Sequence, residues 1–347
     1  PVGASAHVPA FADAPPAPPS VAGLRADMDE IRDIAAPLAN PSGYFAPPAA
    51  PSAPASASAP DAAAPAVQHV AEVRAPAAPA PLPPVVEFRN VSKTYANGFT
   101  AIKDVTFTVE DLHGKGEFVC VLGPSGCGKS TILRLIAGLA PQFPATTGEV
   151  LVGGKPVDGP GSDRGMVFQD YTSFDHRTVV DNIAFGLECQ GVGKAEREAR
   201  AMEWIRKVGL DVDRDAHKFP HQLSGGMRQR VAIARSLILS PRIILMDEPF
   251  GALDPATRLN MQDQLVSLWR EASATVFFIT HSVEEAVYLG DRVYIMSPCP
   301  GTILEELKMP ASDVPAREMQ RRPDFLERVF SVRDKVERLE ESVRAGT

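Results

Sequence analysis

The 347-residue sequence lacks several features that would place it in other classes of protein. It contains no apolar run approaching the roughly 20 residues that cross a bilayer. Its start lacks a charged head followed by an apolar block, so no signal peptide is expected. Basic residues number 35 against 43 acidic ones, and the net charge of -8 argues against non-specific nucleic-acid binding. Any membrane role is therefore expected to run through a partner protein.

Cysteine is also scarce. The chain has four, at Cys120, Cys127, Cys189 and Cys299. None is paired in a C-x-x-C spacing and no histidine cluster accompanies them, so a metal site built on cysteine is not expected. Free thiols in a reducing compartment are the ordinary interpretation.

Residues 1–84 have few aromatic and few charged residues and are dominated by Ala, Pro and Ser. Such a segment cannot bury enough apolar surface to offset the entropy lost on ordering, so a disordered arm is predicted. Within it, residues 20–38 place apolar side chains at helical spacing with Asp, Glu and Arg opposite. This stretch predicts either a docking helix for a partner or a nascent helix that is marginal alone.

Ordered sequence is expected from residue 85. Short apolar or alternating segments predict strands at Val85–Phe88, Val105–Val109, Phe118–Leu122, Ile243–Met246, Val276–Thr280 and Arg292–Met296. Helical periods such as that of Lys194–Val208 alternate with the strands, which indicates an α/β fold. After Pro310 the chain is polar and helical, and its apolar residues from Val329 to Val343 fit either a short coiled coil or a terminal helix packed on its own domain.

A phosphate-binding loop is predicted after the strand Phe118–Leu122. The segment GPSGCGKS matches G-x-x-x-x-G-K-[ST] in full, with a buried strand before it and a helical run, Thr131–Leu139, after it. Glycines let the backbone N–H groups converge on phosphate oxygens, and the helix N-terminus adds its dipole. The candidate nucleotide ligands are Gly123, Pro124, Ser125, Gly126, Cys127, Gly128, Lys129, Ser130 and Thr131. We expect Lys129 to reach the β- and γ-phosphates, Ser130 to ligate Mg²⁺, and Cys127 to offer an accessible thiol.

Two acids end the apolar segment Ile243–Met246. Asp247 is expected to hold Mg²⁺ and Glu248 to act as the general base that polarises the attacking water. Adjacent residues of an extended strand point in opposite directions, so the two acids can have different roles.

A second glycine-rich anion nest precedes another helical run. The segment Leu223–Arg230 reads LSGGMRQR, and Ser224, Gly225 and Gly226 supply a hydroxyl and backbone N–H groups at a helix N-terminus. One small domain rarely needs two such nests for one nucleotide. The two nests are therefore interpreted as serving different nucleotides.

These motifs together resemble the ATPase subunit of an ABC transporter over residues 85–310. The loop at Gly123–Ser130 resembles the Walker A motif, Ile243–Glu248 the Walker B motif, and Leu223–Met227 the family signature, with Met227 where Gln is commoner. The resemblance implies a P-loop NTPase fold with a RecA-like core, an antiparallel β subdomain and a helical subdomain at about 172–222. Residues 311–347 would form a C-terminal helical tail.

Four smaller segments fall in the order that the family has. Tyr95 takes the place of the aromatic that stacks on adenine, although an ordinary strand-edge tyrosine would fit the sequence equally. Gln169 resembles the Q-loop glutamine, which senses Mg²⁺ and the attacking water. Gly251–Asp254 resembles the D-loop, with Gly where Ser is frequent, and places Asp254 near the nucleotide. His281 resembles the switch histidine that contacts the γ-phosphate.

The resemblance also implies partners. Two copies of the chain would meet head to tail, with the signature of one closing over the ATP and Mg²⁺ held by the other. Integral membrane permease subunits would bind the pair at the cytoplasmic face of the cell membrane. A periplasmic or extracellular solute-binding protein would take part indirectly, and no nucleic acid is expected.

Other classes of ABC ATPase remain as alternatives. A soluble ABC ATPase acting on DNA or ribosomes predicts a long coiled-coil insertion or tandem cassettes, which the sequence does not show. A non-hydrolytic binding module predicts loss of Glu248 or His281, and both are present. An exporter ATPase is often fused to membrane helices, and the sequence shows no apolar run long enough to form one. An importer is therefore favoured.

Among importers, the sequence resembles the nitrate/sulfonate/taurine group. The segments that carry the resemblance are Phe277–Ala286, Ser297–Gly301 and Arg177–Ile183. The group implies a small anionic or organosulfur/nitrogen solute such as nitrate, a sulfonate or taurine. Members typically carry Leu-Pro-Trp before the arginine, whereas this chain has Phe174-Asp175-His176. That segment faces the permease in the family, so the substrate stays open.

Overall fold

The structure is a computed structural model that describes residues 82–112, 115–170 and 173–345. The segment at residues 20–38 therefore lies outside the described residues. The strands are β1 (Val86–Thr94), β2 (Thr100–Val109), β3 (Phe118–Leu122), β4 (Thr147–Val152), β5 (Lys155–Pro156), β6 (Arg164–Val167), β7 (Ile243–Asp247), β8 (Thr275–Thr280), β9 (Arg292–Met296) and β10 (Ile303–Lys308). The helices are α1 (Lys129–Ala137), α2 (Val179–Cys189), α3 (Lys194–Lys207), α4 (Val212–Asp215), a 3₁₀ turn (Pro220–Gln222), α5 (Gly225–Leu237), α6 (Pro255–Ala272), α7 (Val283–Leu289), α8 (Ala316–Met319) and α9 (Pro323–Ala345).

The strands form two sheets. A four-stranded antiparallel sheet has the order β2-β1-β4-β5, and a six-stranded sheet has the order β10-β9-β3-β8-β7-β6. In the second sheet β9, β3, β8, β7 and β6 are parallel and β10 is antiparallel to β9. The predicted α/β core is confirmed, and the antiparallel sheet fits the β subdomain that the resemblance implied.

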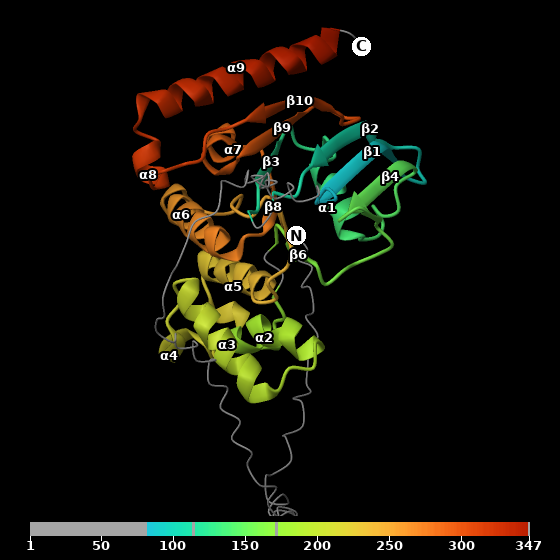
Figure 1. Ribbon diagram of the computed structural model, residues 1–347. Helices are drawn as coiled ribbons and strands as arrows, with labels where there is room; N and C mark the ends of the chain where they lie inside the picture. The colour runs from blue at the N-terminus through green and yellow to red at the C-terminus, as the bar shows by residue number, and fades with distance from the viewer. Residues whose placement is uncertain (1–81, 113–114, 171–172, 346–347) are drawn as a thin grey trace, which may run out of the picture. The chain divides into compact units, whose positions relative to one another are not determined.

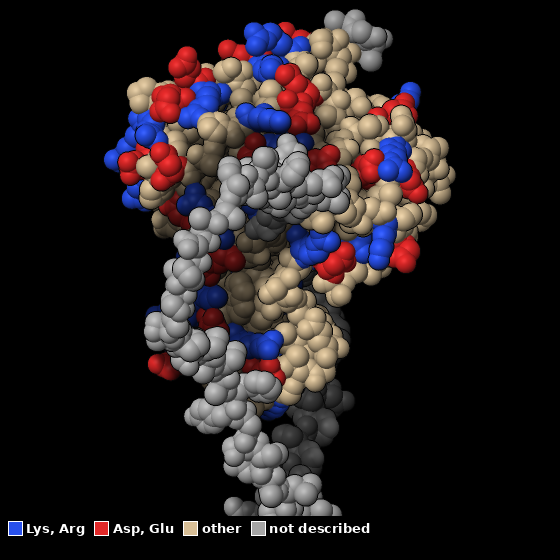
Figure 2. All heavy atoms as spheres, in the orientation of Figure 1, with Lys and Arg blue, Asp and Glu red and all other residues tan. Residues whose placement is uncertain are grey.

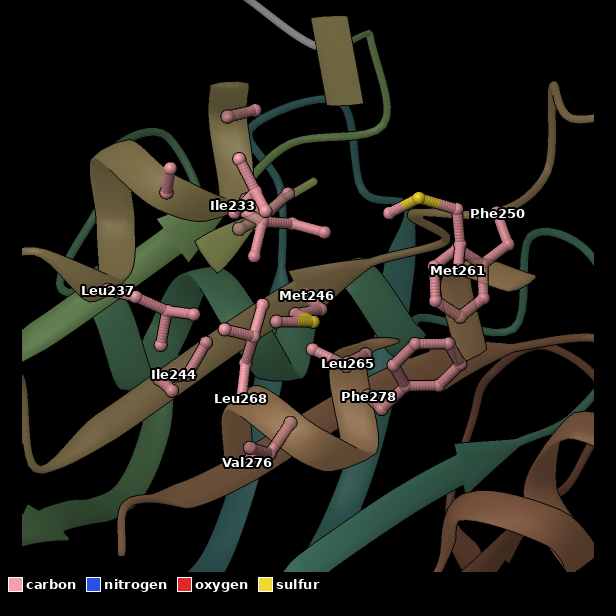
Figure 3. Close-up of a cluster of buried hydrophobic side chains, with 14 of the residues drawn as sticks. Ile233, Leu237, Ile244, Met246, Phe250, Met261, Leu265, Leu268, Val276 and Phe278 are labelled. Carbon is pink, nitrogen blue, oxygen red and sulfur yellow. The ribbon is translucent and has the colours of Figure 1, made fainter. Parts of the chain in front are cut away.

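The central strands β3, β7, β8 and β9 of the six-stranded sheet are buried on both faces, which explains their almost continuous apolar sequences. Alternate residues of β7 face different helices: Ile244 and Met246 join one apolar cluster, while Ile243 and Leu245 join another. The first cluster takes in α5 and α6, and Figure 3 shows their side chains meeting β7 and β8. The second takes in α1 and the antiparallel sheet. Helices α1 and α5 therefore pack on opposite faces of the sheet.

The C-terminal helix α9 packs on the same domain instead of standing free. Phe325, Val329 and Val332 are buried in the cluster that contains α5 and α6. Salt bridges join Arg333 to Glu284 of α7 and Lys335 to Glu305 of β10. Figure 1 shows α9 lying along the β10 side of the sheet. Of the two sequence interpretations of this tail, the packed terminal helix is therefore the one observed.

Several short polar elements were not expected from the sequence. Strand β4 begins with three exposed residues, and β10 has no fully buried residue, so neither has the apolar run that identifies a central strand. Both are held by backbone pairing with a more apolar neighbour, β1 for β4 and β9 for β10.

Candidate nucleotide site

The glycine-rich loop joins β3 to α1 and has the backbone that phosphate binding requires. Gly126 and Gly128 adopt φ values of 77° and 94°, which side chains other than glycine adopt at a cost. A Cβ at Gly128 would come within 2.8 Å of the carbonyl oxygen of Ala101, so this glycine is also needed for space. Helix α1 begins directly at Lys129, and its first N–H groups point back toward the loop.

The side chain of Lys129 packs against the phosphate-binding loop. Its side chain is buried, and Nζ donates hydrogen bonds to the carbonyl oxygens of Gly123 at 2.9 Å and Pro124 at 3.0 Å. The same Nζ lies 3.8 Å from a carboxylate oxygen of Glu248. An ammonium group held on weak neutral acceptors can transfer to phosphate oxygens with a gain in charge pairing.

Ser130 and Asp247 come together from different elements, α1 and β7. Ser130 Oγ donates a hydrogen bond of 2.8 Å to Asp247 Oδ1. Burial raises the pKa of the Asp247 carboxyl, and the hydrogen bond from Ser130 opposes this rise. A hydroxyl beside a carboxylate is the hard oxygen donor set that Mg²⁺ prefers, so the two residues fit a magnesium ion that also binds phosphate.

Parallel pairing brings three loops to one edge of the sheet. Leu122 of β3 lies opposite Thr280 of β8, and Asp247 of β7 lies opposite Ile279. Because β3, β7 and β8 run in the same direction, the residues that follow them emerge side by side. The phosphate loop, Glu248 and His281 therefore converge on one site.

Glu248 stands between Lys129 and His281. Its Oε2 lies 3.3 Å from His281 Nδ1, and its side chain is 20% exposed, so it is reachable by water. Its backbone has a φ of 44°, in the left-handed region that a non-glycine residue enters at a cost of about 1–2 kcal/mol. Backbone strain of this kind is retained at functional sites, where the surrounding structure holds the residue in the strained conformation.

The second nest lies on the other face of the sheet. Ser224 is exposed and caps α5, accepting a hydrogen bond from the N–H of Met227 at 3.3 Å. A Cβ on Gly226 would meet the side chain of Thr257 on α6 at 3.2 Å. Buried Gln229 donates to the carbonyl oxygen of Pro249 at 2.6 Å, which ties α5 to the loop after β7. Because α5 and α1 cover opposite faces, the two nests lie on different sides of the sheet.

The remaining predicted residues lie around these two nests. Asp254 accepts hydrogen bonds from the N–H groups of Ala256 and Thr257, which cap α6; bonding to Thr257 lowers the pKa of this carboxyl. Tyr95 stacks with Phe99, with ring centroids 6.3 Å apart. Gln169 is exposed in the turn after β6, at the same sheet edge as Glu248.

One sequence expectation about the loop is wrong. Cys127 was expected to offer an accessible thiol, but it is buried, with 1% of its surface exposed. Its sulfur faces Gly123, where an added Cβ would lie 3.1 Å away, and Gly301 packs against its carbonyl oxygen. Burial raises the pKa of this thiol, which lowers its reactivity further. The thiol of Cys127 is therefore not an accessible group at the loop.

Comparison with known proteins shows the family that the chain resembles. The family model described as "ABC transporter" matches residues 102–251. An uncharacterized ABC transporter ATP-binding protein of Methanocaldococcus jannaschii is 49% identical over 65% of this chain and 82% of its own length. A taurine import ATP-binding protein of Rhizobium johnstonii is 48% identical over 67% of this chain and 87% of its own. A nitrate import ATP-binding protein of Synechocystis sp. is 46% identical over 65% and 84%.

The chain belongs to the ABC transporter family of ATP-binding proteins. A solved dimeric ATP-binding cassette in a post-hydrolysis state, bound to ADP and Pi, is 34% identical, covers 65% of this chain and 99% of its own, and has a TM-score of 0.57. The predicted cassette fold is thus confirmed, and the chain is an ATP-hydrolysing enzyme. The resemblance to the nitrate and taurine importer group is confirmed as well.

This ABC ATPase also contains site neighbours that the sequence analysis missed. Gln229 of α5, Arg258 of α6 and Glu285 of α7 are buried or partly buried polar residues that link the loops of the site. An acid or amide inside an amphipathic helix is usually solvated, so the pattern alone gives no reason to single them out. The sequence did offer one signal for Glu285, which follows His281 by four residues and so lies close to it in the chain.

In the part of the chain that the structure describes, no helix combines the length and the apolar composition that a membrane crossing requires. On the face shown in Figure 2, Lys and Arg side chains of the described residues are interspersed with Asp and Glu.

Proposed function

We propose that this chain is the ATP-hydrolysing subunit of an ABC importer, working as a head-to-tail pair on membrane permease subunits at the cytoplasmic face of the membrane. The observation that carries the proposal is the convergence of Lys129, Ser130, Asp247, Glu248 and His281 at one sheet edge, with the Ser224 nest on the opposite face. Half of each site must then come from a second copy.

Each residue has a defined part in the proposed hydrolysis. Lys129 leaves the loop carbonyls and binds the β- and γ-phosphates of ATP. Glu248 accepts a proton from the attacking water at a carboxylate oxygen. His281, whose Nδ1 is held by Glu248, contacts the γ-phosphate through the other side of its ring. Water adds to the γ-phosphorus as the bond to ADP breaks, giving ADP and Pi.

Ser130 and Asp247 would hold a magnesium ion, with Gln169 nearby. When bound, Mg²⁺ neutralises phosphate charge. Asp247 stays anionic to hold it, while Ser130 turns its hydroxyl away from Asp247 to offer a lone pair. Tyr95 supplies a flat face for adenine.

The second copy is proposed to complete the site. Ser224, Gly225 and Gly226 of the partner present a hydroxyl and helix N–H groups to the γ-phosphate. Closure requires ATP, and hydrolysis removes the group that holds the pair together. Opening and closing of the pair would switch the permease between outward and inward states.

The transported solute is proposed to be a small anionic or organosulfur/nitrogen solute such as nitrate, a sulfonate or taurine. The support is the naming of relatives as taurine and nitrate import proteins at 45–48% identity. Residues Phe174, Asp175 and His176 differ from the pattern of this group at the segment that faces the permease. The solute is selected by other chains of the importer. The proposal about the solute therefore rests on the names of the relatives and not on the nucleotide site.

The experiment is gentle purification of the tagged full-length chain from its native membranes. The importer proposal predicts a co-purifying multispanning permease and a solute-binding protein, and calorimetric titration of that binding protein with nitrate, sulfonates and taurine then tests the solute. A permease that co-purifies with no binding protein and secretes solute would favour the exporter. Recovery with soluble proteins or nucleic acid alone would contradict transport and leave the ATPase chemistry standing.

A further inference from the structure

A buried acid that the proposed mechanism does not use lies next to residues 280–282, the switch loop that carries His281. Glu285 of α7 is 6% exposed, and both of its carboxylate oxygens face hydrogen-bond donors. Burial raises the pKa of this carboxyl, while the hydrogen bond from Thr280 and the charge of Arg258 oppose the rise. A carboxylate is costly to bury unless it is paired, so its partners show what it is there to hold.

One set of partners is the pair of residues that flank His281. Thr280 Oγ1 donates to Glu285 Oε2 at 2.5 Å, and the N–H of Ser282 donates to the same Thr280 hydroxyl at 3.0 Å. The N–H of Glu285 in turn donates to Ser282 Oγ at 3.2 Å. The residues on each side of His281 are thereby tied to one acid, and the exposed imidazole lies 3.3 Å from Glu248.

The other set of partners lies on α6, directly after the D-loop segment Gly251–Asp254. Glu285 Oε1 lies 3.5 Å from Gln262 Nε2 and 3.7 Å from Arg258 Nε. Arg258 Nη2 donates to the carbonyl oxygen of Leu253 within the D-loop at 3.1 Å. Among the described residues, Arg258 Nε is buried and makes no hydrogen bond, so the ion pair with Glu285 is what balances it.

A small cavity lies between Glu248, the candidate base, and the two sets of partners of Glu285. Its volume is about 10 Å³, roughly the space of a single water molecule. Its lining includes Glu248, Gly251, Arg258, His281 and Glu285. The D-loop, the switch loop and Glu248 therefore line one small cavity, and a shift of one element changes the room available to the others.

We propose that Glu285 is a positioning residue that sets His281 against Glu248, and that Arg258 ties this setting to the D-loop carbonyl of Leu253. The proposal rests on the proposed function, because it assigns Glu285 an effect through His281. Movement of the D-loop when a second copy docks reaches the switch histidine through Arg258 and Glu285. The effect is confined to turnover, since neither residue contacts Lys129 or the phosphate loop glycines in the described structure.

The substitution Glu285→Gln tests this with little change in volume. The carboxylate accepts on both sides, whereas a carboxamide has one acceptor oxygen and one NH₂ group. Its NH₂ must then face either the Thr280 hydroxyl or the donors of Gln262 and Arg258. A displaced switch loop is expected to lower kcat about tenfold, in keeping with the cost of small misplacements at a reacting centre, while KM for ATP stays within about twofold.

The experiment measures ATP turnover of the full-length chain in a cycle of four forms: wild type, Glu285→Gln, His281→Ala and the double variant. If Glu285 acts through His281, adding Glu285→Gln to His281→Ala lowers kcat by less than about twofold. Arg258→Met, at a side chain that is one-third exposed, keeps the test open if the buried variant fails to fold, and it is expected to lower kcat several-fold. Asp263→Asn is the matched control, because this acid lies on α6 but bonds Tyr288 and the N–H of Ala316.

The outcomes separate the two levels of the argument. If Glu285→Gln lowers kcat by the same factor in the His281→Ala background as in the wild type, the two effects are independent. This result overturns the positioning role and leaves the proposed site intact. Wild-type turnover of both Glu285→Gln and Arg258→Met overturns it as well. Wild-type turnover of His281→Ala shows instead that the proposed role of His281 is wrong, and the inference falls with it. A lowered kcat in Asp263→Asn equal to that of Glu285→Gln would reduce the effect to general destabilisation.

Discussion

Replacement of Glu248 by Gln offers the sharpest separation of chemistry from folding in this protein. The substitution keeps the side-chain length and removes the charge that lies 3.3 Å from His281 Nδ1 and 3.8 Å from Lys129 Nζ. A carboxamide has no basic oxygen that can take a proton from water. Loss of a positioned general base lowers rates by roughly 10²–10⁴, so kcat is expected to fall by that factor.

The expected effect on stability is much smaller. The Glu248 side chain is partly exposed, and buried Lys129, 3.8 Å away, keeps its hydrogen bonds to two loop carbonyl oxygens when the acid is removed. Loss of this long ion pair is therefore expected to cost about 1 kcal/mol. For a domain of this size, 1 kcal/mol shifts Tm by about 2–4 °C. The backbone strain at this position is unchanged, because Gln has the same Cβ as Glu.

The assay pairs phosphate release at saturating ATP with light scattering after size-exclusion chromatography. Without hydrolysis, ATP should hold the variant as a dimer, whereas the wild type returns to monomers. Glu305→Gln is the control, because this acid of β10 bonds Lys335 of α9 and not the site. Turnover of Glu248→Gln within a few-fold of wild type would refute the assignment of the base, and a loss matched by a large fall in Tm would refute the separation from folding.

Three further predictions follow from single contacts. Ser130→Ala removes the hydroxyl 2.8 Å from Asp247 and should weaken Mg²⁺-dependent ATP binding roughly tenfold, measured with a fluorescent nucleotide in the presence and absence of Mg²⁺; equal affinity with magnesium would contradict it. Gly128→Ala places a Cβ at a φ of 94° and 2.8 Å from a carbonyl oxygen, so Tm should fall by about 2–8 °C and nucleotide binding should be lost, by calorimetry and dye-monitored melting. The hydrogen bond from Arg214 holds the pKa of buried Asp215 well below its usual range. This acid therefore stabilises the fold above its unfolded pKa of about 3.9 and less as pH falls toward the folded value, so the Tm advantage of wild type over Asp215→Asn should shrink progressively below about pH 4; a gap that widens on acidification would be inconsistent with that sign.

The sequence by itself determined the chemistry of this protein because that chemistry is carried by short local motifs. The loop from Gly123 to Ser130 needs only its own glycines, a strand before it and a helix after it, and all three are visible in consecutive residues. The strands β3, β7, β8 and β9 were located within a residue or so, since strands buried on both faces are apolar throughout. The class of ATPase followed from the order of the motifs along the chain.

Only the tertiary structure decided how distant segments meet. The register of β3, β7 and β8 brings Glu248 to His281, and no local pattern fixes a register between strands that are far apart in sequence. The burial of Cys127 depends on the loop around Gly301, which packs on it from more than 170 residues away. Packing of α9 depends likewise on α7, and packing of α8 depends on α6.

The link from Arg258 to Glu285 shows the same limit most clearly. Each residue is an ordinary charged residue of its own helix. The periodicity of neither helix predicts that this charged side chain will be buried. Their meaning comes from the loop ends that they join, the carbonyl oxygen of Leu253 and the hydroxyl of Thr280. A sequence records which groups can form such bonds, but the fold alone decides which of them come within reach, because the partners are brought together by the packing of the sheet and its helices.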